Sequence, residues 1–320
     1  MGNDGEIAVS AVIPAYNAEQ FISETIQSIL DQTYPVCEII VVDDGSADGT
    51  ADVAAKFPRT RVIRRPNGGQ GAARNTGIYA SAGNWIGLLD HDDVWNPQKT
   101  ELQIRHIRPD VGVIHGNQFE VIDFGKLWHR QVHIGPSGTL IRKQTLLDVG
   151  GFEESRAVMG VEDLNLWLKI ALTDWQFVKS EPGLFSWRET GRNQSGDDFK
   201  MSTADLATIE MIGSKVKCDP VEVAKIKQAS RVEYARNLMA EGRWDKAAEL
   251  LRQCPPDLAS RWLSIVSALK FNRLARRDFV AWLQFVDQGR GKRPCSGNCD
   301  LPEKQRKLCM DSCRQPLGRN

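Results

Sequence analysis

An apolar run that ends abruptly in three carboxylates, Asp90, Asp92 and Asp93, is the feature that most limits how this chain can fold. Residues 85–89 are apolar throughout, which predicts a strand buried on both faces. The acids then surface at the carboxyl end of that strand, where open α/β sheets bind their ligands. Three clustered carboxylates repel one another unless a cation lies between them, and Mg²⁺ or Mn²⁺ suits such oxygen-rich clusters. The alternative is an acidic turn without a ligand.

The same arrangement occurs earlier in the chain, where an apolar run at 39–42 is followed by Asp43 and Asp44. Strands are predicted at 9–14, 38–42, 61–64 and 85–89. Helices are predicted between them: one after Asn17, which would be its N-cap, and two more at 50–57 and 71–80. This alternation predicts parallel βαβ units and a sheet covered on both faces. Both acidic clusters would then share one edge of the sheet, which makes that edge the candidate site.

Two other stretches are open to two interpretations. Residues 67–71 are rich in glycine but match neither a P-loop nor a dinucleotide fingerprint. With Arg74 they form either an anion site at a helix start or a simple helix entry with a surface arginine. Glu162 and Asp163 open an amphipathic helix, where the helix dipole alone stabilises acids by about 0.3–1 kcal/mol.

Composition excludes several classes of protein. The chain has 320 residues, with 41 basic and 41 acidic, so it has neither the net positive charge of a nucleic-acid binder nor a polybasic membrane patch. No apolar run reaches the 18 residues of a membrane span, and residues 1–6 do not resemble a secretion signal. We therefore expect a cytoplasmic protein, with a location at the inner face of a membrane and peripheral membrane contact left open.

The pattern divides the chain into three parts. Strand signals stop near residue 200, which predicts an α/β domain at 1–200 and a helical extension at 201–290. Residues 221–240 and 244–254 form a predicted helical pair that is similar to one tetratricopeptide unit. The tail at 291–320 has two C-x-x-x-C pairs, which fit a metal knuckle, a disulfide hairpin or free thiols. These cysteines are Cys295, Cys299, Cys309 and Cys313.

Six short motifs then appear in a fixed order. They are VIPAYN at 12–17, VDDGS at 42–46, ARNTG at 73–77, LDHDD at 89–93, GGF at 150–152, and ED followed by LWL at 162–168. The series resembles the family 2 glycosyltransferases, which are nucleotide-sugar-dependent enzymes of the GT-A fold. It covers about residues 7–195. The resemblance implies a Rossmann-like, mainly parallel α/β sheet, followed here by the α-helical extension.

The resemblance also implies roles for residues that bind the donor. Asp43 and Asp44, with the backbone near Ala15 and Tyr16, would contact the nucleotide base. Arg74 would lie near the base or the phosphates.

Further roles follow for the metal and the chemistry. Asp90 and Asp92 would be the D-x-D pair that binds ribose and Mn²⁺ or Mg²⁺, and Asp93 would be an alternative ligand. Asp163 would be the general base, with Glu162 as its neighbour.

One segment departs from the family pattern. Thr190 occupies the usual place of a histidine that contacts the pyrophosphate, so Arg188 or Arg192 would replace it. The function implied is inverting transfer of a sugar from a UDP- or GDP-sugar to a hydroxyl acceptor, with glycan and lipid-linked acceptors both open. The alternatives are a sugar nucleotidyltransferase and a non-catalytic binding or interaction protein.

Overall fold

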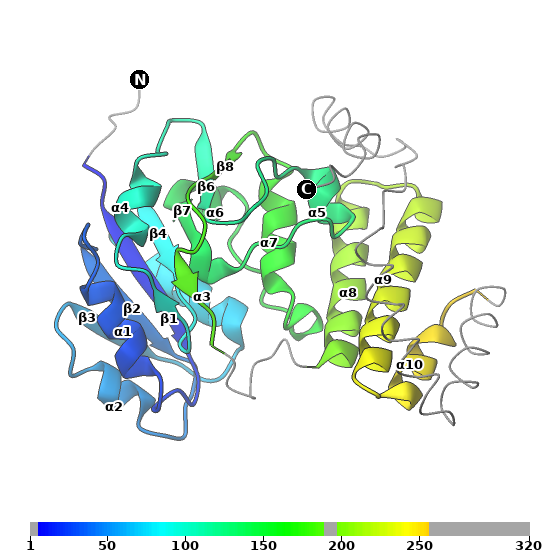
Figure 1. Ribbon diagram of the computed structural model, residues 1–320, viewed down its shortest axis with the longest axis horizontal. Helices are drawn as coiled ribbons and strands as arrows, with labels where there is room; N and C mark the ends of the chain where they lie inside the picture. The colour runs from blue at the N-terminus through cyan, green and yellow to red at the C-terminus, as the bar shows by residue number, and fades with distance from the viewer. Residues whose placement is uncertain (1–5, 189–196, 256–320) are drawn as a thin grey trace. The chain divides into compact units, whose positions relative to one another are not determined.

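The central sheet has seven strands in the order β3-β2-β1-β4-β7-β6-β8, and only β7 runs against the others. The computed structural model describes residues 6–188 and 197–255 (Figure 1). The chain divides into two units, residues 1–193 and 194–320. The predicted mainly parallel α/β class is confirmed.

The strands of the first unit follow the apolar runs of the sequence. Their bounds are β1 Val9–Ala15, β2 Glu38–Asp43, β3 Thr60–Arg64, β4 Trp85–Leu88, β6 Val111–His115, β7 Thr139–Arg142 and β8 Gln176–Lys179. A separate antiparallel pair joins β5 Val94–Trp95 to β9 Phe185–Ser186.

Helices and helical turns lie between the strands. They are α1 Ile22–Leu30, α2 Thr50–Ala54, α3 Gln70–Ala80, α4 Lys99–Ile104, α5 Phe124–Trp128, η1 Pro136–Gly138, α6 Lys143–Asp148, η2 Arg156–Val158 and α7 Glu162–Ile170.

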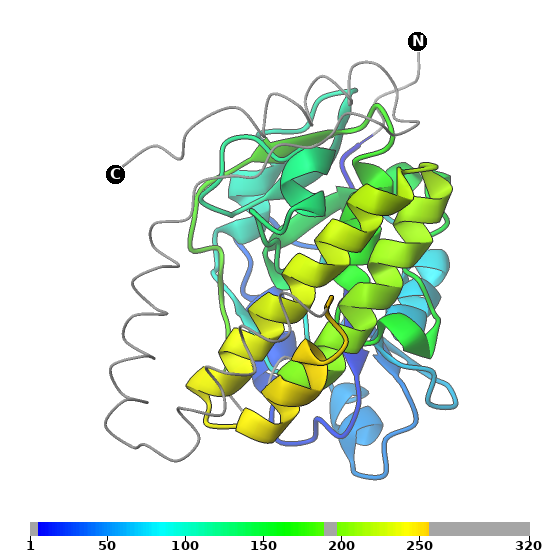
Figure 2. The ribbon, with the colours of Figure 1, turned by 90° about the vertical axis from the view of Figure 1, so that its right-hand side faces the viewer.

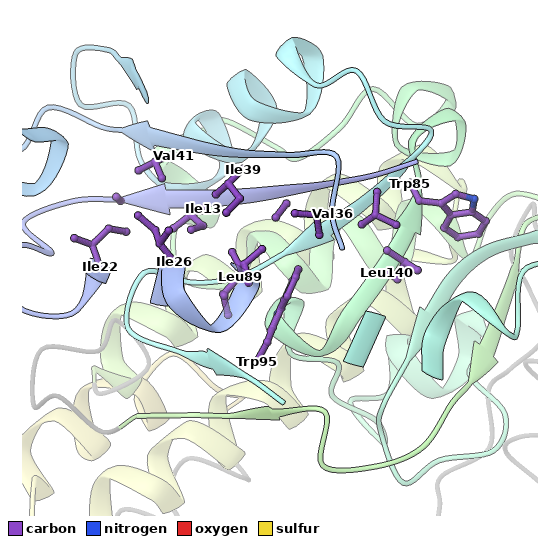
Figure 3. Close-up of a cluster of buried hydrophobic side chains, with 14 of the residues drawn as sticks. Ile13, Ile22, Ile26, Val36, Ile39, Val41, Trp85, Leu89, Trp95 and Leu140 are labelled. Atoms are coloured by element: carbon purple, nitrogen blue, oxygen red, sulfur yellow. The ribbon is translucent and has the colours of Figure 1, made fainter. Parts of the chain in front are cut away.

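Helix α1 and helix α3 cover opposite faces of the sheet. Ile22 and Ile26 of α1 pack with Ile13, Ile39 and Val41 in one buried cluster (Figure 3). The alternate strand residues Ile40 and Val42 pack with Ala73 of α3 in another cluster. This segregation follows from the strand geometry, because successive side chains point to opposite faces.

Gly77 explains how α3 approaches the sheet so closely. A Cβ atom at this position would lie 2.4 Å from Val12 Cγ1 of β1. Only glycine leaves room for the helix at this distance, so Gly77 brings Arg74 and Asn75, on the same helix, close to the carboxyl ends of the strands.

The helix after β1 begins later than predicted, because Asn17 is not its N-cap. The N-cap residue is Phe21, and Asn17 adopts a left-handed conformation with φ 50°. The Asn17 amide N–H donates to Ser46 Oγ, and its side-chain Oδ1 accepts from the Ala47 N–H. Asn17 therefore joins the loop after β1 to the loop after β2.

The described part of the second unit is helical, with α8 Asp198–Lys215, α9 Pro220–Ala240 and α10 Trp244–Leu251. Helices α8 and α9 lie side by side (Figure 2). Gly242, with φ 79°, ends α9 and lets α10 turn back on it. The predicted helical pair is confirmed, while the similarity to a tetratricopeptide unit and the domain bounds stay predictions. The four tail cysteines lie outside the described residues, as do Thr190 and Arg192.

No helix among residues 6–188 and 197–255 is long and apolar enough to cross a membrane.

Candidate active site

The acidic loop, residues 89–93, lies at the carboxyl end of β4, next to the end of β1. The Leu89 N–H donates to the Val12 carbonyl at 3.1 Å and so extends the pairing of β4 with β1. The Asp93 N–H donates back to the Asp90 carbonyl at 3.0 Å and closes a tight turn. Because β2, β1 and β4 are parallel, the loop shares its sheet edge with Asp43 and Asp44, as the sequence predicts.

Asp44 is fully engaged by the glycine-rich loop that precedes α3. Its carboxylate accepts the N–H of Gly68 at 3.0 Å and that of Gly69 at 2.7 Å, and Arg65 Nε lies 3.2 Å away. Asp44 is buried, so these donors replace the water that its charge would otherwise hold. The carboxylate therefore shapes the loop.

The other candidate residues at the ends of β1 and β2 differ in their exposure to solvent. Asp43 is buried and its carboxylate accepts the Ser46 N–H at 3.0 Å. The Ala15 carbonyl accepts the Asp44 N–H at 2.8 Å. Tyr16 is 48% exposed, so its ring is available to a ligand at this edge.

Arg74 joins the acidic loop to the start of α7. Its guanidinium is buried and lies 2.6 Å from Asp90 Oδ1 and 4.0 Å from Glu162 Oε1, and it also lies over the Phe152 ring. The alternative of a surface arginine is therefore wrong. Two groups of acids that are distant in the sequence are brought together by one buried cation.

Asn75 holds the segment that leads to α7. Its side chain donates to the Phe152 carbonyl at 2.9 Å and accepts the Phe152 N–H at 2.8 Å. A Cβ atom on Gly151 would lie 2.4 Å from Asn75 Oδ1, so the glycine permits this contact. The ARNTG and GGF motifs thus form one packed junction beside the site.

Burial and mutual repulsion oppose the ionisation of the acids in the loop. Burial raises the pKa of Asp92, and the charge of Asp90 adds to the rise while His91 and Arg188 oppose it. Burial raises the pKa of Asp93 to about 7, although hydrogen bonds from Ser137 and the Arg188 N–H oppose the rise and Asp90 and Asp92 add to it. This edge of the sheet therefore favours an added positive charge.

Glu162 and Asp163 occupy the first turn of α7. Burial raises the pKa of both carboxyls, while Arg74 lowers each. Asp163 is partly exposed, its Oδ1 accepts the Leu164 N–H at 2.7 Å, and Asp90 and His133 are near enough to influence its charge. Asp163 is thus a half-buried residue whose carboxyl lies at the same edge as Asp90.

Arg188 is held beside the acidic loop by contacts of both its backbone and its side chain. Its N–H donates to Asp93 Oδ1 at 3.2 Å, and its guanidinium lies 2.6 Å from Glu24 of α1. The arginine is therefore near the site while its cation contacts a surface acid.

Within residues 6–188 and 197–255, no three or more His, Cys, Asp or Glu side chains come together as ligands for a metal ion. A metal ion at this site would need further ligands besides these side chains. The two Asp93 oxygens accept hydrogen bonds from Ser137 Oγ and the Arg188 N–H, and Asp90 Oδ1 lies 2.6 Å from Arg74. A cation at this loop would therefore be held by Asp92 and the other oxygen of Asp90. Mg²⁺ is commonly held by one or two carboxylates together with substrate phosphates. The residues therefore fit a cation that binds with a phosphate-bearing ligand.

The family model described as Glycosyl transferase family 2 matches residues 10–163, a range that includes both acidic clusters and ends at Asp163. This segment of the chain, just under half of its length, matches glycosyltransferase family 2.

Two relatives show how far the similarity extends. The Bacillus subtilis protein described as uncharacterized glycosyltransferase EpsJ is 47% identical over 89 residues, which are 27% of this chain and 26% of EpsJ. The Escherichia coli UDP-Glc:alpha-D-GlcNAc-diphosphoundecaprenol beta-1,3-glucosyltransferase WfgD is 38% identical over 119 residues, 36% of this chain and 47% of WfgD. The match thus spans about a quarter of EpsJ and about half of WfgD.

Solved structures identify the fold as GT-A. S. aureus TarS 1-349 in complex with UDP-GlcNAc has a TM-score of 0.58 and 16% identity, over 92% of this chain and 97% of that one. The mannosyltransferase PcManGT from Pyrobaculum calidifontis, in complex with GDP-Man and Mn²⁺, has a TM-score of 0.58 and 18% identity, over 87% and 84% of the two chains. The fold class implied by the sequence motifs is confirmed.

Proposed function

We propose that this chain transfers a sugar from a nucleotide-diphosphate donor to a hydroxyl group, with inversion at the anomeric carbon. The observation that carries the proposal is the position of the Arg74 guanidinium, which contacts both Asp90 and Glu162. Asp163, next to Glu162, then lies on the same edge as the acidic loop. An inverting displacement needs this pairing of a leaving-group site with a separate base.

The donor side uses the carboxyl ends of β1, β2 and β4. Tyr16 and the loop held by Asp44 would bind the nucleotide, and Asp90 and Asp92 would bind ribose and a divalent cation. Arg188 would lie near the pyrophosphate. A UDP- or GDP-sugar fits this assignment, because WfgD is named for UDP-Glc and the two structural neighbours hold UDP-GlcNAc and GDP-Man.

The cation would be Mn²⁺ or Mg²⁺, and it would neutralise negative charge on the departing diphosphate. Asp90 and Asp92 would hold it from the protein side. Asp93 is already engaged by Ser137 and the Arg188 N–H, so its role as a ligand is secondary.

Asp163 would act on the acceptor. Its carboxylate takes the proton of the attacking hydroxyl, the hydroxyl oxygen forms a bond to the anomeric carbon, and the bond from that carbon to the phosphate oxygen breaks. The electron pair leaves with the nucleoside diphosphate. A raised pKa suits this role, because a stronger base accepts a proton more readily near neutral pH.

The acceptor would be a glycan or a lipid-linked molecule. A cytoplasmic location, at the inner face of a membrane where the acceptor is lipid-linked, is consistent with this assignment.

A panel of UDP- and GDP-sugars tests the proposal by thermal shift with and without Mn²⁺, followed by donor hydrolysis with the best ligand. A cognate donor raises the melting temperature by mass action. The Asp163→Asn variant should keep this shift and lose about 10²–10⁴-fold in turnover, which is the usual contribution of a general base. A protein without donor binding or hydrolysis would instead be a scaffold, and release of pyrophosphate from a nucleoside triphosphate would indicate a nucleotidyltransferase.

A further inference from the structure

A short turn, η1, lies directly against the acidic loop and contributes one hydroxyl group to it. Ser137 Oγ donates to Asp93 Oδ2 at 2.6 Å and accepts the Asp90 N–H at 3.1 Å. Ser137 is buried, so water does not compete for either bond. One hydroxyl thus spans the two ends of the acidic turn.

Three side chains from the segment that follows the acidic loop hold this turn in place. They donate to three successive carbonyls: Trp95 Nε1 to Ser137 at 2.9 Å, Gln103 Nε2 to Gly138 at 2.9 Å, and Lys99 Nζ to Thr139 at 2.9 Å. Each donor is buried. The backbone of the turn is therefore fixed at every residue from 137 to 139.

Lys99 is the least expected member of this set. Its ammonium group is fully buried, donates to Gln103 Oε1 at 2.7 Å and lies 4.1 Å from the centre of the Trp95 ring. Within residues 6–188 and 197–255 it forms no salt bridge to a carboxylate. Burial lowers the pKa of Lys99 well below its usual value. Burying a lysine in this way costs free energy. The hydrogen bonds that Lys99 donates to the turn and to Gln103 compensate for that cost.

Trp95 is fixed by a glycine in β4. A Cβ atom at Gly87 would lie 2.6 Å from Trp95 Cη2, so the indole ring packs directly on the strand that carries the acidic loop. The strand, the indole ring and the turn are in continuous contact, and a displacement of η1 would be transmitted to Asp90 and Asp93.

We propose that Ser137 is a positioning residue for the donor site, and that Trp95, Lys99 and Gln103 hold it in register with the acidic loop. The proposal rests on the function proposed above. The Ser137 hydroxyl donates its only hydrogen to Asp93, and this bond keeps the Asp93 carboxylate directed toward η1. It also fixes the backbone of Asp90, and so directs the Asp90 and Asp92 side chains to the donor.

Mn²⁺ binding in the presence of UDP or GDP tests the proposal without requiring turnover. Free Mn²⁺ is measured by electron paramagnetic resonance for wild type, Ser137→Ala and the matched control Ser81→Ala. Ser81 is also a buried serine, but its hydroxyl donates to the Ile78 carbonyl at the end of α3, before β4 begins. We expect Ser137→Ala to weaken nucleotide-dependent Mn²⁺ binding by about 10-fold to 100-fold, as is usual when an outer partner of a metal ligand is lost. Ser81→Ala should bind as wild type does.

A second variant keeps the test decisive if Ser137→Ala does not fold. Lys99→Met retains the length and apolar stem of the side chain but removes the donor to Thr139, and it should weaken Mn²⁺ binding in the same direction by a smaller factor. Wild-type Mn²⁺ affinity in both Ser137→Ala and Lys99→Met would overturn the proposal and leave the proposed function intact. Absence of nucleotide-dependent Mn²⁺ binding in the wild type would instead overturn the metal-assisted function and this proposal together.

Discussion

The acids after β2 and the acids after β4 have the same sequence pattern but different surroundings. Asp44 receives two backbone N–H groups and lies beside Arg65. Asp92 and Asp93 lie where burial and neighbouring carboxylates raise their pKa values, Asp93 to about 7. Backbone N–H groups and Arg65 hold the Asp44 carboxylate, whereas burial and neighbouring carboxylates oppose the ionisation of Asp92 and Asp93.

This difference shows what a carboxylate cluster needs before it can bind a cation. Charge-assisted hydrogen bonds from backbone N–H groups stabilise a carboxylate and also occupy its oxygens. Asp44 therefore acts on the glycine-rich loop, while Asp90 and Asp92 are the residues to which we assign the cation in the proposed function. An apolar strand ending in acids indicates a sheet edge, but the donors around the acids decide which cluster is a site.

The largest expected effect comes from Asp92→Asn. A bound cation contributes several kcal/mol to the charge developing on the leaving group, and each 1.36 kcal/mol is tenfold in rate. We expect turnover to fall by at least about 10²-fold in saturating Mn²⁺, measured as donor hydrolysis. The free energy of unfolding of the metal-free protein should not fall, because the substitution removes a repelling charge. Unchanged turnover would place the cation elsewhere.

Asp44→Asn should lower the stability of the fold and leave the dependence of turnover on Mn²⁺ unchanged. The amide replaces a carboxylate that accepts two N–H groups, and loss of such charged hydrogen bonds lowers the free energy of unfolding by about 1.5–3 kcal/mol. Denaturant melts in urea measure this loss. The Mn²⁺ concentration that gives half-maximal donor hydrolysis should stay at the wild-type value. A marked rise in that concentration would mean that the two clusters do not differ as described.

The smallest expected effect is on the pH dependence of stability. The folded pKa of Asp93, about 7, lies above the usual 3.8, so the folded state binds more protons than the unfolded state between these values. Asp93 therefore makes stability fall as pH rises through this window, by at most about 1.4 kcal/mol per pH unit. Comparing urea melts of wild type and Asp93→Asn at pH 5 and pH 6, with EDTA present, isolates this contribution.

The comparison with Asp93→Asn is needed because His115 acts in the other direction. Burial lowers its pKa to about 4, so His115 makes stability rise with pH between about 4 and 6.5. The Asp93→Asn variant should show a more positive slope than wild type. Equal slopes would show that Asp93 titrates normally.

Local patterns were enough to predict the strands and helices up to residue 89, because each βαβ unit is encoded by adjacent apolar runs. The position of β7 between β4 and β6 was not predictable, since it depends on pairing between segments far apart in the chain. Asn17 shows a local error: its side chain and amide are used by the loop after β2, which overrides helix capping.

The candidate site was predictable to a similar extent. The strand-end position of Asp90 followed from the apolar run before it, and the family motifs indicated Asp163. Arg74 was singled out, but its burial between Asp90 and Glu162 depends on how α3 meets α7. Ser137 had no signal beyond a turn, and Lys99 resembled any helix-surface lysine, because their partners lie in other segments of the chain.

Anomalous diffraction from crystals soaked with Mn²⁺ and UDP or GDP tests the central claim most directly. The account predicts one strong manganese peak within coordination distance of Asp90 and Asp92, with Asp163 facing the same space and Asp44 still bound to Gly68 and Gly69. A peak coordinated by Asp43 or Asp44, or no peak at the acidic loop when nucleotide is bound, would contradict it.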